Sequence, residues 1–219
     1  MSQWRTDYIM INILLVDDHA VVRAGYRMLL QNSEEINIVA EVETGEQACK
    51  AFVDYNPDVV VMDLSMPGMG GLEALRRICA RDAKAKVLVF SMHENTVFVD
   101  QTLNAGAKGY ITKSSAPDVL INAIKAIANG GIYLDAEIAQ HLAFQKARDQ
   151  GTPFSNLSTR EFEIFCLLAE GLNTSHIAKR LSLSYKTVAN YTTQIKSKLE
   201  VTTIAELARM AISHDIVQV

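Results

Sequence analysis

The sequence predicts a doubly wound α/β fold with a five-stranded parallel sheet, followed by a small all-α domain of four helices that contains a helix-turn-helix. Five short apolar segments, rich in β-branched residues, alternate with five segments of helical periodicity, which is the pattern of a parallel sheet covered on both faces. The chain has 219 residues, which is more than one average domain of about 150 residues. We therefore expect one full-sized domain and a small companion.

The expected strands and helices alternate along the first domain. We expect the strands at residues 13–16, 36–42, 59–62, 87–90 and 109–111. The helices between them are expected at residues 20–30, 45–55, 72–80, 97–103 and 119–128. These strands are almost continuously apolar, as strands that are buried on both faces must be.

The pattern changes after Gly130 and Gly131. A polar helix is expected at residues 135–148, and the composition of residues 149–153 is that of a linker. We therefore divide the chain into three parts, at residues 10–130, 131–154 and 155–219.

The third part is predicted to contain four short helices. Capping-box patterns, in which a serine or threonine precedes a glutamate by three residues, open the first and last of them at residues 158–161 and 203–206. The second and third helices, expected at residues 174–181 and 184–199, flank a tight Leu-Ser-Leu-Ser turn. Two short helices around such a turn indicate a helix-turn-helix.

The composition is that of a globular protein. Hydrophobic residues make up 49% of the chain and charged residues 21%, which excludes a disordered, collagen-like or low-complexity protein. Cys49, Cys79 and Cys166 are odd in number and have no CxxC spacing, so we expect neither a disulfide framework nor a structural zinc site. No signal peptide is visible, and no apolar stretch approaches the ~20 residues that span a bilayer. A reducing cytoplasm is the expected location, with no membrane partner.

The net charge of -4 is distributed unevenly. Residues 1–150 carry 14 Lys and Arg against 19 Asp and Glu, whereas residues 151–219 carry 7 against 6. Five basic residues and no acidic residue lie between Asn173 and Leu199. Such a segment suits a polyanion, but a solvated helical face has the same composition, so charge alone leaves both interpretations open.

Five chemically useful side chains follow four of the expected strands. Asp17 and Asp18 follow the first strand, Asp63 the third, Ser91 the fourth and Lys113 the fifth. In a doubly wound sheet of order 2-1-3-4-5 these strand ends lie at the edge where ligands bind. Three carboxylates there suit Mg²⁺, which prefers oxygen ligands. Together with a hydroxyl and an ammonium group, they fit phosphoryl transfer onto a carboxylate.

Each of these residues has a simpler explanation when it is taken alone. An aspartate at a strand end is usually a turn or cap residue, and a single lysine is usually a solvated surface charge. Their shared placement at carboxyl-terminal strand ends favours a common site. The sequence contains no GxxxxGKS/T motif, and Glu73 stands where the third glycine of GxGxxG is needed, so other phosphate-binding motifs are excluded.

Two sets of motifs resemble known bacterial regulators. Residues 14–19 (LLVDDH), 61–68 (VMDLSMPG) and 109–113 (GYITK) resemble the receiver domain of two-component response regulators. Residues 157–161 (LSTRE), 177–181 (IAKRL) and 187–191 (TVANY) resemble the LuxR-type helix-turn-helix. Together the two sets cover about residues 11–214 and resemble the NarL/FixJ subfamily. Residues 131–134 with the helix after them resemble regulators of the GacA/UvrY kind.

This resemblance implies a phosphorylation-controlled DNA-binding transcription regulator. The roles it implies are phosphoacceptor for Asp63; Mg²⁺ ligands for Asp17, Asp18, Asp63 and the Leu64 backbone carbonyl; phosphoryl contact for Lys113; and switch residues for Ser91 and Tyr110. The implied phosphodonor is a histidine kinase or phosphorelay protein. Self-phosphorylation and autodephosphorylation at Asp63 are the only reactions expected of the chain.

The resemblance also names the three parts of the chain. It makes residues 10–130 the receiver domain, residues 131–154 a linker with a helix, and residues 155–219 the DNA-binding domain. Residues 1–9 precede the usual start of the family, which leaves Met1 and Met10 as alternative starts.

Two other functions use the same features. An aspartyl-phosphate hydrolase also has a nucleophilic aspartate and Mg²⁺, but it typically needs a second carboxylate two residues later, where this chain has Ser65. A signalling adaptor would retain phosphorylation while its tail binds protein instead of DNA. Measured DNA affinity distinguishes the adaptor from the transcription regulator.

The third tail helix has one face for packing and one for DNA. Val188, Tyr191, Ile195 and Leu199 recur at helical spacing and are expected to pack inward. On the opposite face, Asn and Gln can bind adenine, and Lys can bind guanine or phosphate. The expected DNA contacts are Lys186, Thr187, Ala189, Asn190, Thr193 and Gln194 on this helix, with Lys179, Lys196 and Lys198 on the DNA backbone. Two such domains related by a twofold axis would bind an inverted repeat in double-stranded DNA.

The last helix carries an apolar set with two possible roles. Its members are Ile204, Leu207, Ala208, Ala211 and Ile212. They either pair with a second copy, giving a homodimer when the protein is phosphorylated, or fill the core of the small domain.

Overall fold

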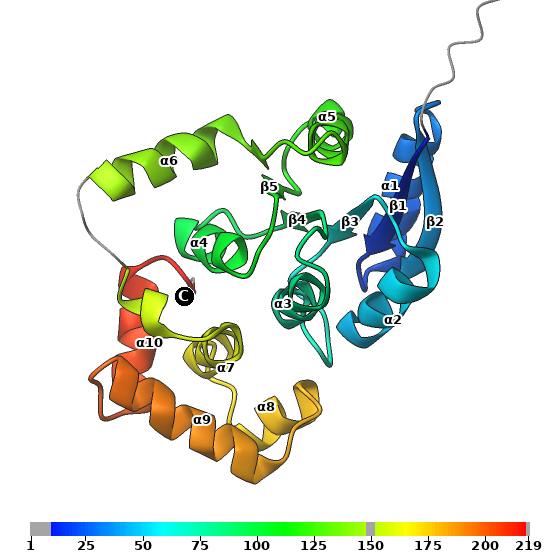
Figure 1. The fold of residues 1–219 in the computed structure, drawn as a ribbon. Helices are drawn as coiled ribbons and strands as arrows, with labels where there is room; N and C mark the ends of the chain where they lie inside the picture. Colours follow the sequence, from blue (N-terminus) through cyan, green and yellow to red (C-terminus); the bar gives the residue numbers. More distant parts are fainter. Residues whose placement is uncertain (1–9, 148–151, 218–219) are drawn as a thin grey trace, which may run out of the picture.

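The predicted parallel sheet forms the centre of the first domain (Figure 1). The structure is a computed structural model that describes residues 10–147 and 152–217. Five strands pair in parallel in the predicted order 2-1-3-4-5. They are β1 (Ile11–Val16), β2 (Ile36–Val42), β3 (Val59–Met62), β4 (Val87–Ser91) and β5 (Gly109–Thr112). The predicted fold class is therefore confirmed.

A sixth strand, β6 (Tyr133–Leu134), corrects the prediction of a five-stranded sheet. It pairs in parallel with β5, with Tyr133 beside Gly109 and Leu134 beside Tyr110. The turn at Gly130, whose φ is 85°, precedes the return of the chain to the edge of β5. Two residues are too few to show a period of alternation, and this strand depends on unpaired backbone groups of β5, so periodicity could not predict it.

Helices cover both faces of the sheet. They are α1 (Ala20–Gln31), α2 (Gly45–Tyr55), α3 (Gly71–Arg81), α4 (Thr96–Asn104) and α5 (Pro117–Ala128). Successive residues of a strand point to opposite faces. Ile13 and Leu15 therefore pack in the cluster with α1 and α5, whereas Leu14 and Val16 pack in the cluster with α2, α3 and α4.

The second domain contains the predicted helix-turn-helix, formed by α8 and α9. The elements after β6 are α6 (Ala136–Ala147), the 3-10 turn η1 (Pro153–Asn156), α7 (Thr159–Ala169), α8 (Thr174–Arg180), α9 (Tyr185–Lys198) and α10 (Ile204–Ser213). Both capping boxes are confirmed, because Ser158 accepts from the Glu161 amide and Thr203 from the Glu206 amide. Part of the expected 149–153 linker and the end of the expected 135–148 helix lie outside the described residues, as do residues 1–9.

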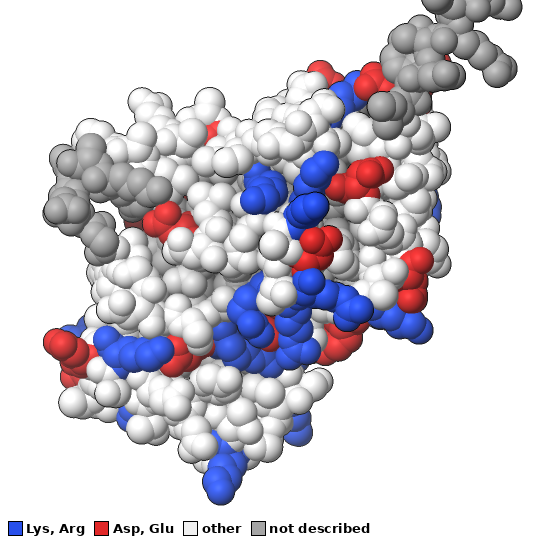
Figure 2. Space-filling view, viewed as in Figure 1, with Lys and Arg blue, Asp and Glu red and all other residues white. Residues whose placement is uncertain are grey.

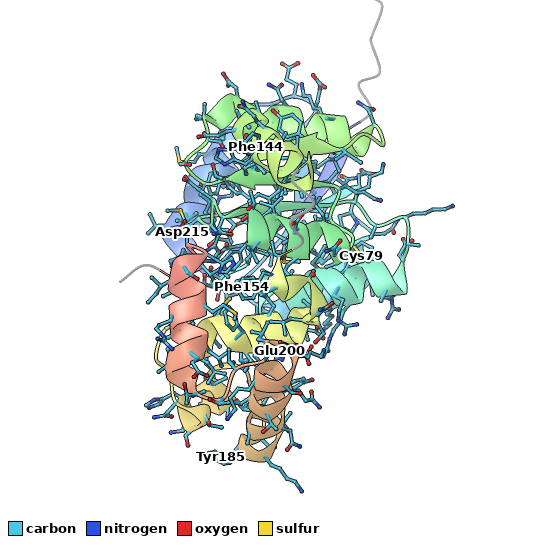
Figure 3. The ribbon with its side chains drawn as sticks, turned by 90° about the vertical axis from the view of Figure 1, so that its left-hand side faces the viewer. Cys79, Phe144, Phe154, Tyr185, Glu200 and Asp215 are labelled. Atoms are coloured by element: carbon cyan, nitrogen blue, oxygen red, sulfur yellow. The ribbon has the colours of Figure 1, made fainter. Side chains whose placement is uncertain are left out.

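The two domains share one continuous hydrophobic cluster. The Phe98 ring of α4 lies edge-on to the Phe162 ring of α7, with centroids 5.1 Å apart. Phe154 is fully buried and lies between the domains in Figure 3. Its carbonyl accepts a 2.9 Å hydrogen bond from the Gln101 side chain of α4. The second domain is thus docked on the side of the sheet that α3 and α4 cover.

Helix α3 begins directly against the end of β3. A Cβ at Gly71 would lie 1.7 Å from the Asp63 carbonyl oxygen, so glycine is needed for this close approach. The Gly71 amide donates to the Leu64 carbonyl at 3.1 Å. These contacts fix the segment after β3, where the predicted site lies.

Replacing Gly71 with alanine should destabilise the protein, because the added Cβ would strike rigid backbone. We expect the free energy of unfolding to fall by about 1–3 kcal/mol, as is usual for overpacking. Gly25 in α1 has nothing within 4 Å of an added Cβ, so Gly25→Ala should raise the free energy of unfolding by roughly 0.5–1 kcal/mol. Urea unfolding measures both variants. Changes of the same sign and size would contradict the close approach of α3 to β3.

Candidate functional site

The acidic site lies at the carboxyl-terminal edge of the sheet. One ligand atom from each of Asp17, Asp18, His19 and Asp63 lies within 4.8 Å of the others. Asp17 and Asp63 are buried, at 2% and 3% exposure, and Asp18 is half-buried. The structure therefore brings together the three carboxylates that the sequence predicted.

Lys113 reaches into this acidic site from the end of β5. Its Nζ lies 2.7 Å from Asp17 Oδ2 and 2.9 Å from Asp63 Oδ2. Burial lowers the pKa of Lys113, but the Asp17 and Asp63 carboxylates outweigh burial and raise that pKa overall. The ammonium group is therefore charged and lies between the two carboxylates.

Two carboxylate oxygens in the site fit the role of metal ligands. Asp18 Oδ1 and Asp63 Oδ2 are buried without a hydrogen bond of acceptable geometry, although His19 and Lys113 lie beside them. Buried polar atoms normally have hydrogen-bond partners. Oxygen atoms of this kind are the ligands that Mg²⁺ prefers, so the residues present fit this ion.

The Leu64 carbonyl does not fit its predicted role as a metal ligand. It accepts the Met66 and Gly71 amides, each at 3.1 Å. A carbonyl oxygen has two lone pairs, and both are engaged by these amides. The direction of a backbone carbonyl depends on the local turn, which the motif alone did not determine.

His19 belongs to the site, although sequence reasoning did not identify it. Its Nδ1 lies 2.8 Å from Asp18 Oδ1, and its amide donates to Asp17 Oδ1 at 2.8 Å. The ring is 62% exposed, so it forms the solvent side of the site. Its position directly after the two aspartates was the available signal.

The predicted switch residues Ser91 and Tyr110 both hydrogen-bond to the backbone of His93. The Ser91 hydroxyl is fully buried and accepts from the His93 amide at 3.2 Å. The Tyr110 hydroxyl donates to the His93 carbonyl at 2.6 Å. Burial raises the pKa of Tyr110, so its hydroxyl remains a neutral donor. Both side chains therefore hold the backbone that follows β4.

His93 connects the end of β4 to the second domain. Its ring stacks on the Phe98 ring with centroids 3.9 Å apart and an angle of 5° between the planes. Its Nε2 lies 3.2 Å from the Ser65 hydroxyl. Burial lowers the pKa of His93, which outweighs the opposite effect of Asp63. Because Phe98 contacts Phe162, a path of side chains leads from the acidic site to α7.

The outward face of α9 carries the predicted base-reading residues. Lys186, Asn190, Thr193 and Gln194 are exposed, and Thr187 and Ala189 are half-buried. Val188 and Ile195 on the opposite face are fully buried, as predicted. In Figure 3, Tyr185 marks the amino end of α9 at the tip of the molecule, away from the first domain.

The three lysines predicted to contact the DNA backbone differ in their surroundings. Lys179 on α8 is exposed. Lys198 Nζ lies 2.6 Å from Glu161 Oε2, and Lys196 Nζ donates to the Thr202 carbonyl at 3.3 Å. Lys196 and Lys198 are thus engaged within the domain. Figure 2 shows basic side chains in a band where the two domains meet and again at the tip of the second domain.

Comparison with known families defines the class of protein. Residues 13–125 match the response regulator receiver domain, and residues 155–211 match the LuxR family of bacterial regulatory proteins. The chain therefore belongs to the response regulators that carry a LuxR-type DNA-binding domain. Members of this family act as transcription factors rather than as classical enzymes, and a receiver domain implies a kinase partner.

Relatives of similar length support this assignment. The response regulator UvrY of Escherichia coli (strain K12) is 40% identical over 207 residues, which cover 94% of this chain and 95% of UvrY. The response regulator GacA of Pseudomonas aeruginosa is 38% identical over 210 residues, covering 95% and 98%. The chain is thus a phosphorylation-controlled transcription regulator.

A solved structure shows the same architecture on DNA. RcsB from Salmonella enterica serovar Typhimurium, bound to promoter rprA in the presence of the phosphomimetic BeF3⁻, has a TM-score of 0.69 and 27% identity to this chain. The match covers 92% of this chain and 98% of the RcsB chain. Within residues 10–147 and 152–217 of the present structure, no helix has the length and apolar character needed to cross a membrane.

Lys113 should contribute to stability as well as to the site. Lys113→Met leaves the buried Asp17 and Asp63 carboxylates without their cation, so we expect the free energy of unfolding to fall by about 3–5 kcal/mol without Mg²⁺. Lys125 forms a partly exposed ion pair with Glu35. Lys125→Met should therefore lower the free energy of unfolding by only about 0–1 kcal/mol. Urea unfolding in the presence of EDTA measures both. Equal losses would contradict the buried ion pairs of Lys113.

Proposed function

We propose that Asp63 accepts a phosphoryl group from a histidine kinase or phosphorelay protein in a Mg²⁺-dependent reaction. The observation that carries this proposal is a buried Asp63 carboxylate beside two further carboxylates and one ammonium group. An Asp63 oxygen attacks the phosphorus atom, and the bond from phosphorus to the donor breaks. Lys113 contacts the oxygens of the transferred group. Asp17, Asp18 and Asp63 would hold Mg²⁺, which supplies charge neutralisation.

The chemistry of this chain is limited to its own Asp63. A small phosphodonor serves for self-phosphorylation, and water releases the phosphoryl group in autodephosphorylation. A hydrolase acting on other substrates typically needs a carboxylate at the position of Ser65. This chain has a serine there instead of a carboxylate, which supports the regulator over the hydrolase.

The signal passes from Asp63 through the end of β4. Phosphorylation adds up to about two negative charges and three strong acceptors. The Ser91 hydroxyl turns toward these acceptors and leaves the His93 amide, while Tyr110 moves with the His93 carbonyl. The His93 ring then shifts on Phe98, which in turn contacts Phe162 of the DNA-binding domain.

The DNA-binding domain acts as a homodimer on inverted repeats in double-stranded DNA. In α10, Leu207 and Ala211 are fully buried, whereas Ile204 and Ile212 are 40% and 43% exposed. One side of this helix therefore fills the core, and the other is available to a second copy. The reading face of α9 is exposed as well, so phosphorylation would promote dimerisation and DNA binding by freeing the docked domain as a whole.

We also propose three domain boundaries and a cytoplasmic location for the protein. Residues 10–130 form the receiver domain, residues 131–154 the linker with its helix, and residues 155–219 the DNA-binding domain. The family matches at residues 13–125 and 155–211 support these boundaries. Three free cysteines support a cytoplasmic location, where thiols stay reduced. A chain that is phosphorylated but does not bind DNA would instead be an adaptor.

Asp63 should be the site of phosphorylation. Acetyl phosphate with Mg²⁺ should add one phosphoryl mass to the wild-type chain and none to Asp63→Asn, which lacks the nucleophilic carboxylate. Asp18→Asn should raise the Mg²⁺ concentration needed for labelling, because one hard ligand is lost. Asp54→Asn changes an exposed carboxylate on α2 and serves as the control. Intact-protein mass spectrometry gives the result, and labelling of Asp63→Asn would show that the acceptor lies elsewhere.

Asn190 and Lys179 should have different roles on DNA. Asn190→Ala should weaken binding to the preferred site by ~1–3 kcal/mol and relax preference at one base position. Lys179→Ala should weaken binding to all sequences alike and reduce the salt dependence by about one contact. Competition on a randomised DNA library at two salt concentrations separates the roles. If Lys179→Ala alone lost the base preference, α9 would contact DNA through a different face.

A further inference from the structure

The residue that follows the two aspartates, His19, is not explained by helix capping. It is the N-cap residue of α1, a position where serine, threonine, aspartate or asparagine usually satisfies the first amides of the helix. The His19 side chain makes no capping hydrogen bond. Its ring lies against the carboxylates of the acidic site instead. The residue type therefore relates to the acidic site rather than to the helix.

The backbone of His19 is held in place on both sides. Its amide donates to Asp17 Oδ1 at 2.8 Å, and its carbonyl accepts the Arg23 amide of α1 at 2.9 Å. The Arg23 guanidinium donates to the Asp17 carbonyl at 2.6 Å. The imidazole ring is therefore attached to fixed backbone beside the acidic site. Groups that are held in position before binding lose less entropy when they bind.

The distances around His19 Nδ1 are close to those between neighbouring ligand atoms on a metal ion. Nδ1 lies 2.8 Å from Asp18 Oδ1 and 3.5 Å from Asp17 Oδ1. Bonds of ~2.1 Å to a tetrahedral or octahedral ion place neighbouring ligand atoms roughly 3.0–3.4 Å apart. The two distances lie on either side of this range, so small side-chain movements bring the three atoms to one ion.

The oxygen atoms of the acidic site are divided between an ammonium group and the imidazole ring. Lys113 approaches Oδ2 of Asp17 and of Asp63. His19 approaches Oδ1 of Asp17 and of Asp18. Despite these neighbours, Asp18 Oδ1 and Asp63 Oδ2 are buried without a hydrogen bond of acceptable geometry, and the Asp63 side chain is only 3% exposed. A cation that binds both oxygens and the ring nitrogen would satisfy them.

We propose that His19 is a nitrogen ligand of the acidic site, and that it makes this site prefer a divalent transition metal such as Zn²⁺ over Mg²⁺. Imidazole suits Zn²⁺, whereas carboxylates without a nitrogen ligand suit Mg²⁺. One imidazole with several carboxylates is a donor set that Zn²⁺ accepts. Within residues 10–147 and 152–217, this is the one group of at least three such side chains close enough to hold an ion. The inference rests on the proposed function in taking the acidic site as the Mg²⁺ site.

Zn²⁺ and Mg²⁺ compete for the same carboxylates if His19 is a ligand. Mg²⁺ loses its waters reluctantly and usually keeps several of them, so it gains little from a nearby ring nitrogen. Zn²⁺ binds histidine nitrogen directly. The His19 ring is 62% exposed, so an ion reaches Nδ1 from solvent. The fraction of chains that hold Mg²⁺ for phosphoryl transfer therefore falls as the Zn²⁺ concentration rises.

Calorimetric titration of the full-length chain with Zn²⁺ and with Mg²⁺, in the absence of a phosphodonor, tests this role. His19→Asn replaces the ring nitrogen with an amide oxygen, and asparagine is a preferred N-cap residue, so α1 should remain intact. The ratio of Zn²⁺ affinity to Mg²⁺ affinity should fall about 10- to 100-fold, because even the loss of an outer-shell partner of a metal ligand has an effect of this size. His176→Asn changes an exposed histidine on α8 and is the matched control, which should keep the wild-type ratio.

Nitrogen-15 NMR of the histidine side chains gives a result that a purely structural role of His19 would not change. The chain has five histidines, and the His19 signals are those that disappear in His19→Asn. Addition of Zn²⁺ should shift the Nδ1 resonance of His19 through a direct bond, whereas Mg²⁺ should shift it much less. Asp18→Asn should raise the Zn²⁺ concentration needed for this shift, because a neighbouring ligand is weakened.

Two results would overturn the role of His19. The proposal is wrong if His19→Asn keeps the wild-type ratio of affinities while its circular dichroism shows folded protein. A Zn²⁺ titration that leaves His19 Nδ1 unshifted would also contradict it, because the ion would then lie elsewhere. Failure of the proposed function gives a different result. If the acidic site does not bind Mg²⁺, Asp18→Asn leaves the Mg²⁺ affinity unchanged, whereas failure of the His19 ligand alone preserves the dependence on Asp18.

Discussion

The ion pairs of Lys113 with Asp17 and Asp63 are the interaction on which the rest of the site depends. They join the ends of three strands, β1, β3 and β5, and all three side chains are buried. A buried charge that loses its partner strongly destabilises the folded protein. The three groups must therefore stay in register with one another, and any new charge on Asp63 must be met by movement of its neighbours. This requirement makes the site responsive to modification.

Most of the fold and the acidic site could be predicted from short-range patterns. The alternation of apolar and helical segments predicted a doubly wound parallel sheet, and the order 2-1-3-4-5, which is one of the common orders of that fold, placed Asp17, Asp63 and Lys113 together. No knowledge of packing was needed, because the carboxyl ends of parallel strands always lie at one edge. The buried and exposed faces of α9 were likewise evident from helical spacing.

Other features could not be predicted, because they depend on contacts between distant segments. The Leu64 carbonyl turns toward α3 because the Gly71 amide lies there. Lys198 is bound to Glu161, which is on another helix, so a basic residue expected at DNA is occupied elsewhere. Glu163 belongs to a pattern that reads as an ordinary amphipathic helix. Its side chain lies against Gly70 at the amino end of α3, which is almost a hundred residues earlier in the sequence.

The short strand β6 has a consequence for how copies of this protein can meet. A sheet edge with unpaired backbone groups is a template for another chain, and proteins commonly protect such edges with very short strands. Here the β5 edge is covered by two residues, and the chain then leaves the sheet as α6. Extension of the sheet across this edge into a second molecule is thereby limited, because β6 offers only two residues for pairing. On this side of the receiver domain, association is left to helix surfaces, whose contacts form and break without the risk of aggregation that long open strands bring. At the opposite edge of the sheet, the described residues place no such cover strand beside β2.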